Sequence, residues 1–170
     1  MGAIKLISNK ILTLQETLAV LCSVFIVLGV GSGAFFRYVL GVSFHGLEEL
    51  LVIGSFWMYF IGASYASHKG KHISAEVFSV YCSNPVLRYS VSVLANFITV
   101  SLSVLYTYYG WEFLMWSFDA DGKTSRLQIP LVFGHSAVFF GFFLMSCYFF
   151  NDLMGEMKKL KAAYYGKPTE

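Results

Sequence analysis

Long apolar runs alternate with short polar ones along the chain, and four of the runs are long enough to cross a membrane. A membrane helix needs about 20 mainly apolar residues. The third run is long enough to project beyond the hydrocarbon layer. We therefore expect an all-α integral membrane protein, a single membrane domain over 1–170, with spans over residues 14–40, 47–67, 85–118 and 130–150.

The starts of the last two runs carry local helix signals. Asn84 is a suitable N-cap, and Pro85 follows it at the first helical position, where its missing N–H costs nothing. Pro130 predicts the same start for the fourth span. The first run exceeds the apolar region of a signal peptide, about 7–15 residues, so we expect it to be retained as a span.

A short amphipathic pattern lies between the second and third spans. Ile73, Val77, Val80 and Tyr81 recur at the spacing of one helix face. The segment is too short to span a membrane. We expect a helix over residues 73–82 that lies in the membrane interface. A structured loop is the alternative.

The distribution of positive charge predicts the orientation. Because the chain has four spans, its N-terminus, the loop between spans two and three, and its C-terminal tail must share one side. The positive-inside rule makes that side cytoplasmic, which gives an N-in, C-in topology. The residues that carry this argument are Lys5, Lys10, Lys69, Lys71, Arg88, Lys158, Lys159, Lys161 and Lys167.

The composition agrees with a membrane protein and excludes several functions. The chain is 56% apolar and 13% charged, whereas a soluble domain has about 25% charged residues. Its basic residues lie at span ends rather than along a stripe, so we assign no nucleic-acid role. It has no phosphate loop, no nucleophile with a base and no metal cluster. We predict no catalytic residue, metal site or cofactor in this chain, and no enzymatic activity.

Two adjacent carboxylates open the second span. Glu48 and Glu49 lie near a helix N-terminus, where the exposed N–H groups and the helix dipole favour negative charge. Arg37 closes the first span only a tight turn away, which predicts an ion pair with one of the two glutamates. The functional alternative is contact with another subunit or with a ligand at the outer face.

A basic patch follows the second span. His68 and His72 are four residues apart and flank Lys69, Gly70 and Lys71. Metal binding would need further ligands. We interpret the patch as one that touches lipid headgroups or a partner, and we expect Lys69, Lys71, His72 and Arg88 to anchor the chain there.

Small and aromatic residues mark candidate packing surfaces. Gly29 and Gly33 form a GxxxG pair in the first span, and Gly62 has small-residue spacing in the second. Such residues let helix backbones approach closely in lipid. Whether the neighbouring helix belongs to this chain or to another stays open. Trp57 lies deeper than the other tryptophans and is a candidate for packing on a partner.

Two histidines near the outer face leave a second function open. His45 and His135 could serve as haem ligands if they faced each other between helices. The chain would then be a haem-binding membrane-anchor subunit of a redox enzyme.

The spans lack the features of a chain that transports cargo on its own. No span carries an ionisable residue near its centre, and no two spans are broken at matching places. The chain is therefore expected to be an accessory or scaffold subunit.

Taken in order, these features resemble the small membrane subunit of the tripartite ATP-independent periplasmic (TRAP) transporters, the DctQ-like family. The resemblance covers nearly the whole chain. The residues that carry it are Arg37-Tyr38, Glu48-Glu49, Trp57, Gly62-Ala63, the patch HKGKHI that begins at His68, and the polar stretch from Thr124 to Ile129-Pro130.

This resemblance implies partners and a task. A large multi-span subunit would carry the transport site and the Na⁺ sites, and a soluble periplasmic protein would deliver an organic acid. Import into a bacterium across its inner membrane would be driven by the sodium gradient. The small subunit, here similar to an unfused form and closest to the sialic-acid branch, would enlarge the stationary scaffold. Glu48, Glu49 and Arg37 would anchor its outer rim, near the docked binding protein.

Overall fold

Four long helices make up the described part of the chain, which a computed structural model gives for residues 2–42, 45–69 and 85–165. Side chains are described for residues 9–42, 46–69 and 86–165. The helices are α1 (Gly2–Val39), α2 (His45–Lys69), α4 (Pro85–Asp119) and α5 (Val132–Tyr164). Each contains an apolar segment long enough to cross a membrane. As predicted, the described part of the chain is all-helical, with four helices long and apolar enough to span a membrane.

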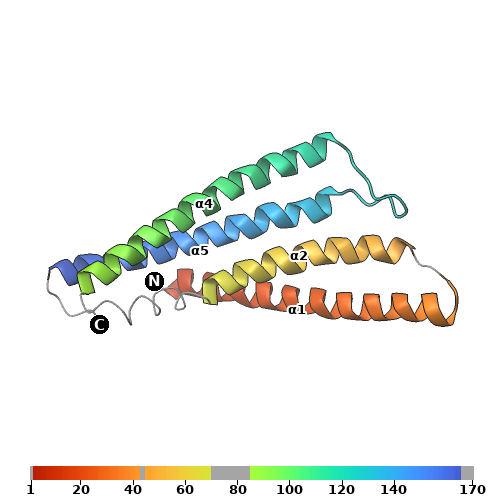
Figure 1. The fold of residues 1–170 in the computed structure, drawn as a ribbon, viewed down its shortest axis with the longest axis horizontal. Coiled ribbons are helices and arrows are strands. Elements are labelled where there is room, and N and C mark those ends of the chain that lie inside the picture. The colour runs from red at the N-terminus through yellow and green to blue at the C-terminus, as the bar shows by residue number, and fades with distance from the viewer. Residues whose placement is uncertain (1, 43–44, 70–84, 166–170) are drawn as a thin grey trace.

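The helices form an open array in which only α2 and α5 have a neighbour on each side (Figure 1). Within the described chain, α1 packs on α2, α2 packs on α5, and α5 packs on α4. The start of α1, the end of α2, the start of α4 and the end of α5 all lie at one end of the array. This arrangement agrees with an even number of spans; which end is cytoplasmic stays a prediction.

The helix ends follow local sequence rules in part. Past the end of α1, Gly41 takes a positive φ of 67°, and the N–H of Val42 bonds the carbonyl of Phe36 at 3.1 Å. This is the glycine-terminated helix end in which a left-handed residue satisfies orphan carbonyls. α5 begins at Val132 rather than at Pro130, because Pro130 pairs with Lys123 across the preceding loop.

Two helices extend beyond the predicted spans. α5 continues to Tyr164, past the predicted end at residue 150, and α1 begins at Gly2. An apolar pattern in the sequence marks only the part of a helix that lies inside the bilayer. The backbone hydrogen bonds of the helix can continue past that part, because they do not depend on apolar side chains. The interfacial helix predicted over residues 73–82 lies outside the described residues.

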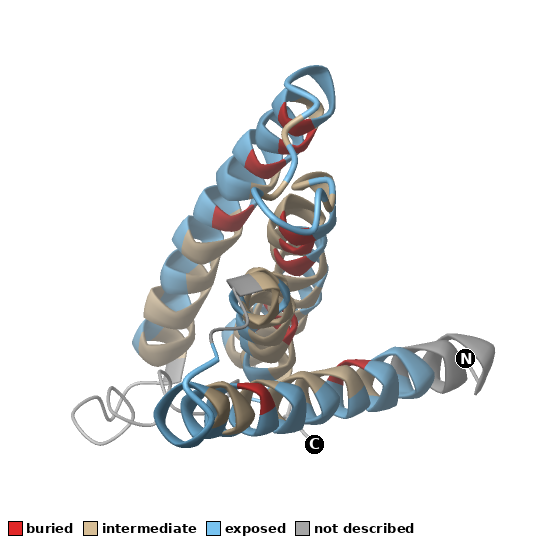
Figure 2. Cartoon of the chain, turned by 90° about the vertical axis from the view of Figure 1, so that its right-hand side faces the viewer, coloured by how far each residue is buried: buried red, intermediate tan, exposed pale blue. Residues whose placement is uncertain are grey.

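Close backbone contact joins the middle of the array. A Cβ at Gly141 of α5 would lie 2.6 Å from Cβ and 3.0 Å from the carbonyl oxygen of Phe60 in α2. A Cβ at Gly110 of α4 would lie 3.4 Å from Cα of Phe139 in α5. Small residues therefore allow the approach of neighbouring helices. Figure 2 shows that buried residues lie where helices meet, while the outer faces of α1 and α4 are largely exposed.

Candidate functional site

The loop between α4 and α5 folds back over the N-terminus of α2. The carboxylate of Glu49, one turn into α2, accepts hydrogen bonds from two consecutive backbone N–H groups of this loop. The N–H of Arg126 donates to Oε1 at 2.7 Å, and the N–H of Leu127 donates to Oε2 at 2.9 Å. Charge-assisted bonds of this kind are stronger than neutral ones. Glu49 therefore attaches the loop to α2.

The loop has internal bonds that hold its shape. The N–H of Thr124 donates to the carbonyl of Ile129 at 2.9 Å, and the N–H of Ile129 donates to Oγ1 of Thr124 at 3.0 Å. The N–H of Leu131 donates to the carbonyl of Gly122 at 2.9 Å. Gln128 takes a positive φ of 55°, which reverses the chain within the loop and presents two N–H groups to Glu49.

An apolar contact completes this attachment. A Cβ at Gly46, in the first turn of α2, would lie 3.1 Å from Cγ and Cδ2 of Leu127. The Leu127 side chain thus covers the backbone of α2 where a larger residue would push it away. We call residues 46–49 together with residues 122–131 the outer rim.

The two adjacent glutamates have different environments. Glu49 is half-buried and engaged by the loop, whereas Glu48 is exposed. Arg37 is exposed as well, and among the described residues it forms no ion pair with either glutamate. The described residues thus lack the predicted ion pair, and the Glu49 carboxylate is instead occupied by backbone donors from the other hairpin. The two glutamates were predictable from the sequence, but the backbone partner of Glu49 was not.

His135 is held by residues of α2 and α4. Its Nδ1 lies 2.8 Å from Oγ of Ser117, and its ring centroid lies 4.3 Å from that of Phe113 and 6.2 Å from that of Phe56. The side chain of His45 lies outside the described ones. Among the described residues, no group of three His, Cys, Asp or Glu side chains is positioned to hold a metal ion. These contacts give His135 a packing role between α4 and α5.

Trp57 of α2 contacts two residues of α5. Its Nε1 donates to the carbonyl of Phe133 at 2.9 Å, and its ring stacks on Phe140 with centroids 6.4 Å apart. The residue expected at a partner surface therefore already makes two contacts inside its own chain.

The three candidate glycines fall into two groups. Gly29 and Gly33 face α2 of the same chain, where a Cβ would lie 2.5 Å from Leu51 and 3.4 Å from Leu47 respectively. A Cβ at Gly62 would meet nothing within 4 Å. The GxxxG pair thus serves packing within the chain, whereas Gly62 lies beside open space.

The opposite end of the array carries a polar network that the sequence analysis missed. Gln15 of α1 is 2% exposed and donates from Nε2 to Oγ of Ser64 in α2 at 2.6 Å. The hydroxyl of Tyr148 in α5 donates to Oε1 of Gln15 at 2.8 Å. Three helices meet at this amide. The available signal was an uncharged amide inside the predicted span 14–40, since polar groups within a span normally face protein.

The headgroup-anchoring candidates are only partly described. Lys69 lies with Nζ 4.7 Å from the ring centroid of Tyr65, and Arg88 lies 6.0 Å from the ring of Tyr89. Both are near the end of the array that holds the start of α1. Lys71 and His72 lie outside the described residues.

Comparison with protein families identifies the chain. Residues 26–159 match the model of the DctQ component of tripartite ATP-independent periplasmic transporters. The chain belongs to the DctQ family. A comparison with curated proteins gave no match.

Membership in the DctQ family determines the general task. The family supplies a membrane component of TRAP transporters and is not known as an enzyme family; it works with a large membrane subunit and a periplasmic binding protein. The matched range begins within α1 and ends within α5, so it includes the outer rim, Trp57 and His135. Gln15 lies before it.

Proposed function

We propose that this chain is a scaffold subunit of a sodium-gradient-driven TRAP transporter that imports an organic acid. The cargo is a carboxylate, with sialic acid the first candidate to test. The large membrane subunit would carry the transport site and bind Na⁺, and this chain would stay fixed in the bacterial inner membrane. This proposal follows from the family, and the open arrangement of the helices supports it.

The open array of helices is the structural observation that supports the proposal. A chain that moves cargo alone needs an enclosed path lined with polar groups. Here the helices stand side by side, and grooves of about 360 and 390 Å³ are open on the surface. Four helices arranged in this way form an open array rather than an enclosed cavity. Such an array can support a moving neighbouring subunit without binding the cargo of that subunit.

The outer rim is the part of this chain that we assign to docking the periplasmic protein. In the N-in, C-in topology it faces the periplasm. The loop is fixed to α2 by Glu49 and Leu127, so it presents a preformed surface and little ordering entropy is lost on binding. Arg126 and Glu48 are exposed there and are available for polar contacts with a partner.

Co-expression with the large subunit tests the proposal. A tagged chain should recover the large subunit from detergent, and proteoliposomes that contain both should take up the acid when a sodium gradient and the binding protein are supplied. The chain alone should take up none. Uptake by the chain alone would contradict the scaffold role.

A matched pair of variants tests the rim. Glu49→Gln replaces two accepting oxygens by one oxygen and one NH₂ group, which cannot accept both loop N–H bonds. We expect this variant to lower uptake while the large subunit is still recovered. Glu48→Gln removes the same charge from the adjacent position and should leave uptake close to that of the unaltered chain. Equal effects of the two would contradict the docking role of the loop.

A further inference from the structure

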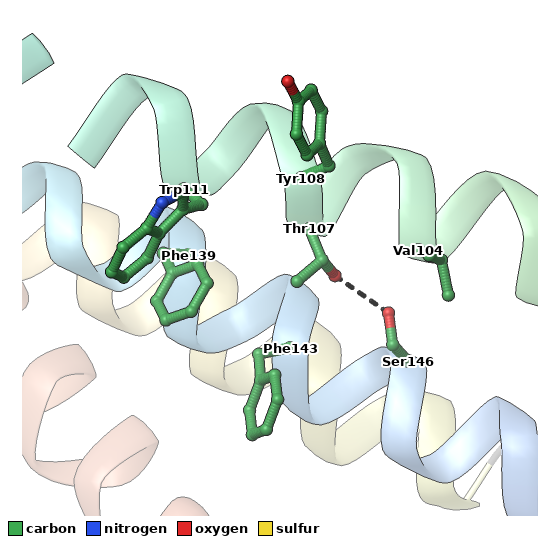
Figure 3. Close-up of a pocket in the computed structure, with 7 residues that line it drawn as sticks. All are labelled: Val104, Thr107, Tyr108, Trp111, Phe139, Phe143 and Ser146. Atoms are coloured by element: carbon green, nitrogen blue, oxygen red, sulfur yellow. Dashed lines mark hydrogen bonds between the residues drawn. The ribbon is translucent and has the colours of Figure 1, made fainter. Parts of the chain in front are cut away.

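The outward face of α4 carries a carboxylate. Glu112 is exposed, and the hydroxyl of Tyr108, one turn earlier, donates to its Oε1 at 2.8 Å. Tyr108 is itself 57% exposed, and Figure 3 shows it pointing away from α5. The pair therefore points outward from the array.

Contacts between neighbouring helices give the depth of Glu112. Gly110 lies against Phe139 of α5, and the next residue, Phe140, stacks on Trp57 of α2. Glu112 is thus close to level with Trp57, which follows Glu49 by eight residues, or about 12 Å of helix. Glu49 lies near the start of the apolar segment of α2. Glu112 is therefore nearer the middle of the membrane than its place in the predicted span 85–118 suggested.

Such a position is costly next to lipid. Ionisable side chains within a span normally face protein or water rather than hydrocarbon. In the described chain, α4 packs on α5 alone, so none of the four described helices covers Glu112. In the middle of α1, the side chains exposed by half or more are aliphatic: Val20, Leu21, Val24, Val27 and Leu28. The outer face of α4 also exposes apolar side chains, such as Leu94 and Leu102, but it carries the exposed carboxylate of Glu112 in addition.

A groove runs beside this carboxylate. It has a volume of about 360 Å³ and lies along the contact of α4 with α5. Thr107 and Ser146 share a hydrogen bond of 2.9 Å within it, as Figure 3 shows. Its lining is otherwise mainly apolar and aromatic: Val104, Tyr108, Trp111, Phe139 and Phe143. An apolar groove next to one hydrogen-bond acceptor, the Glu112 carboxylate, suits a transmembrane helix that carries one hydrogen-bond donor.

We propose that this face of α4 receives a transmembrane helix of the large TRAP subunit, and that an arginine or lysine of that helix bonds Glu112. The assignment rests on the proposed function. A cationic side chain of the partner helix would offset the negative charge of Glu112, which lipid tails cannot do. A second copy of this chain docked on the same face would bring two carboxylates together, which repel each other.

Photocrosslinking tests the surface in the assembled complex. Tyr108 is replaced by p-benzoylphenylalanine in one chain and Val27, which is 70% exposed on α1, in another. After illumination of membranes that contain both subunits, Tyr108 should give a covalent adduct with the large subunit and Val27 should give none. An adduct from Val27 but not from Tyr108, or a dimer of this chain from Tyr108, overturns the proposal.

A substitution tests the charge. Glu112→Leu should lower recovery of the large subunit by a tagged chain about threefold or more, the loss expected for one interhelical bond in a membrane. Val27→Ala should not change recovery. Undiminished recovery with Glu112→Leu overturns the role of Glu112. If the unaltered chain recovers no large subunit, the proposed function itself fails; if it does and only the Tyr108 adduct is missing, the docking surface alone fails.

Discussion

The two helical hairpins of this protein use glycine contacts and side-chain hydrogen bonds in different proportions. In the α1–α2 hairpin, glycines lie against large apolar side chains, Gly29 against Leu51 and Gly54 against Phe25, and one described side-chain hydrogen bond crosses the contact, from Gln15 to Ser64. In the α4–α5 hairpin, side-chain hydrogen bonds cross the contact at three levels: Ser92–Glu156, Thr107–Ser146 and Ser117–His135.

The difference matters because apolar side chains gain little from meeting each other in lipid. Glycine contacts set how close two helices come, while hydrogen bonds also fix how far one has slid along the other. The α4–α5 hairpin therefore has a defined register, and its loop is held in a shape that reaches across to Glu49 of the first hairpin. The α1–α2 hairpin supplies the surface on which that loop lies.

The largest effect is expected at the joint between the hairpins. Gly141→Leu places a side chain against the backbone of Phe60, which cannot move aside without shifting α2. We expect a loss of about 3 kcal/mol or more in the free energy of unfolding, at the upper end of overpacking costs. Denaturant unfolding in micelles measures it. Gly155→Leu is the control, since a Cβ there meets nothing within 4 Å. Equal losses of unfolding free energy in the two variants would contradict the close contact between Gly141 and Phe60.

A smaller effect is expected inside the first hairpin. Gly29→Leu meets the side chain of Leu51 rather than backbone, and that side chain can adopt another rotamer. We expect a loss of about 1–3 kcal/mol, seen as a lower unfolding midpoint. Gly31→Leu, two residues away and facing open space, should cost little. If Gly31→Leu proved the more damaging, the orientation of α1 would be wrong.

Removal of the buried amide comes next in magnitude. Gln15→Leu deletes two hydrogen bonds that join α1 to Ser64 and Tyr148, at about 0.6 kcal/mol each on average in membrane proteins. Thr17→Val is a suitable control, because the Thr17 hydroxyl bonds the carbonyl of Thr13 within its own helix. The free energy of unfolding should fall in the first variant and stay close to the original value in the second.

The smallest effect is expected from one bond of the second hairpin. Thr107→Val keeps the volume but loses the bond to Ser146, with an expected cost of about 0.6 kcal/mol. Thr99→Val serves as the control, since the Thr99 hydroxyl donates to the carbonyl of Ala95 in α4 itself. A loss as large as that of Gly29→Leu would mean that hydrogen bonds hold this hairpin more strongly than close packing holds the other.

The spans could be predicted from sequence because about 20 consecutive apolar residues have few other uses. Glu49 was also found, since two carboxylates before an apolar run are conspicuous. Its partners were not, because they are backbone N–H groups of residues 126 and 127, and backbone donors leave no mark in a sequence. Gln15 and Glu112 were overlooked for another reason: their depth depends on how helices align, which apolar runs alone do not determine.

The paired ends of α4 and α5 reach farther than α2 does. α2 ends at Lys69, while α5 continues to Tyr164, and Figure 1 shows the start of α4 and the end of α5 extending beyond the end of α2. Ser92 of α4 and Glu156 of α5 bond each other at 3.1 Å. Among the described residues, these two helix ends therefore extend past α2 as a bonded pair. We expect an antibody fragment raised against them to report the sidedness of the chain and to add mass to a small particle for imaging.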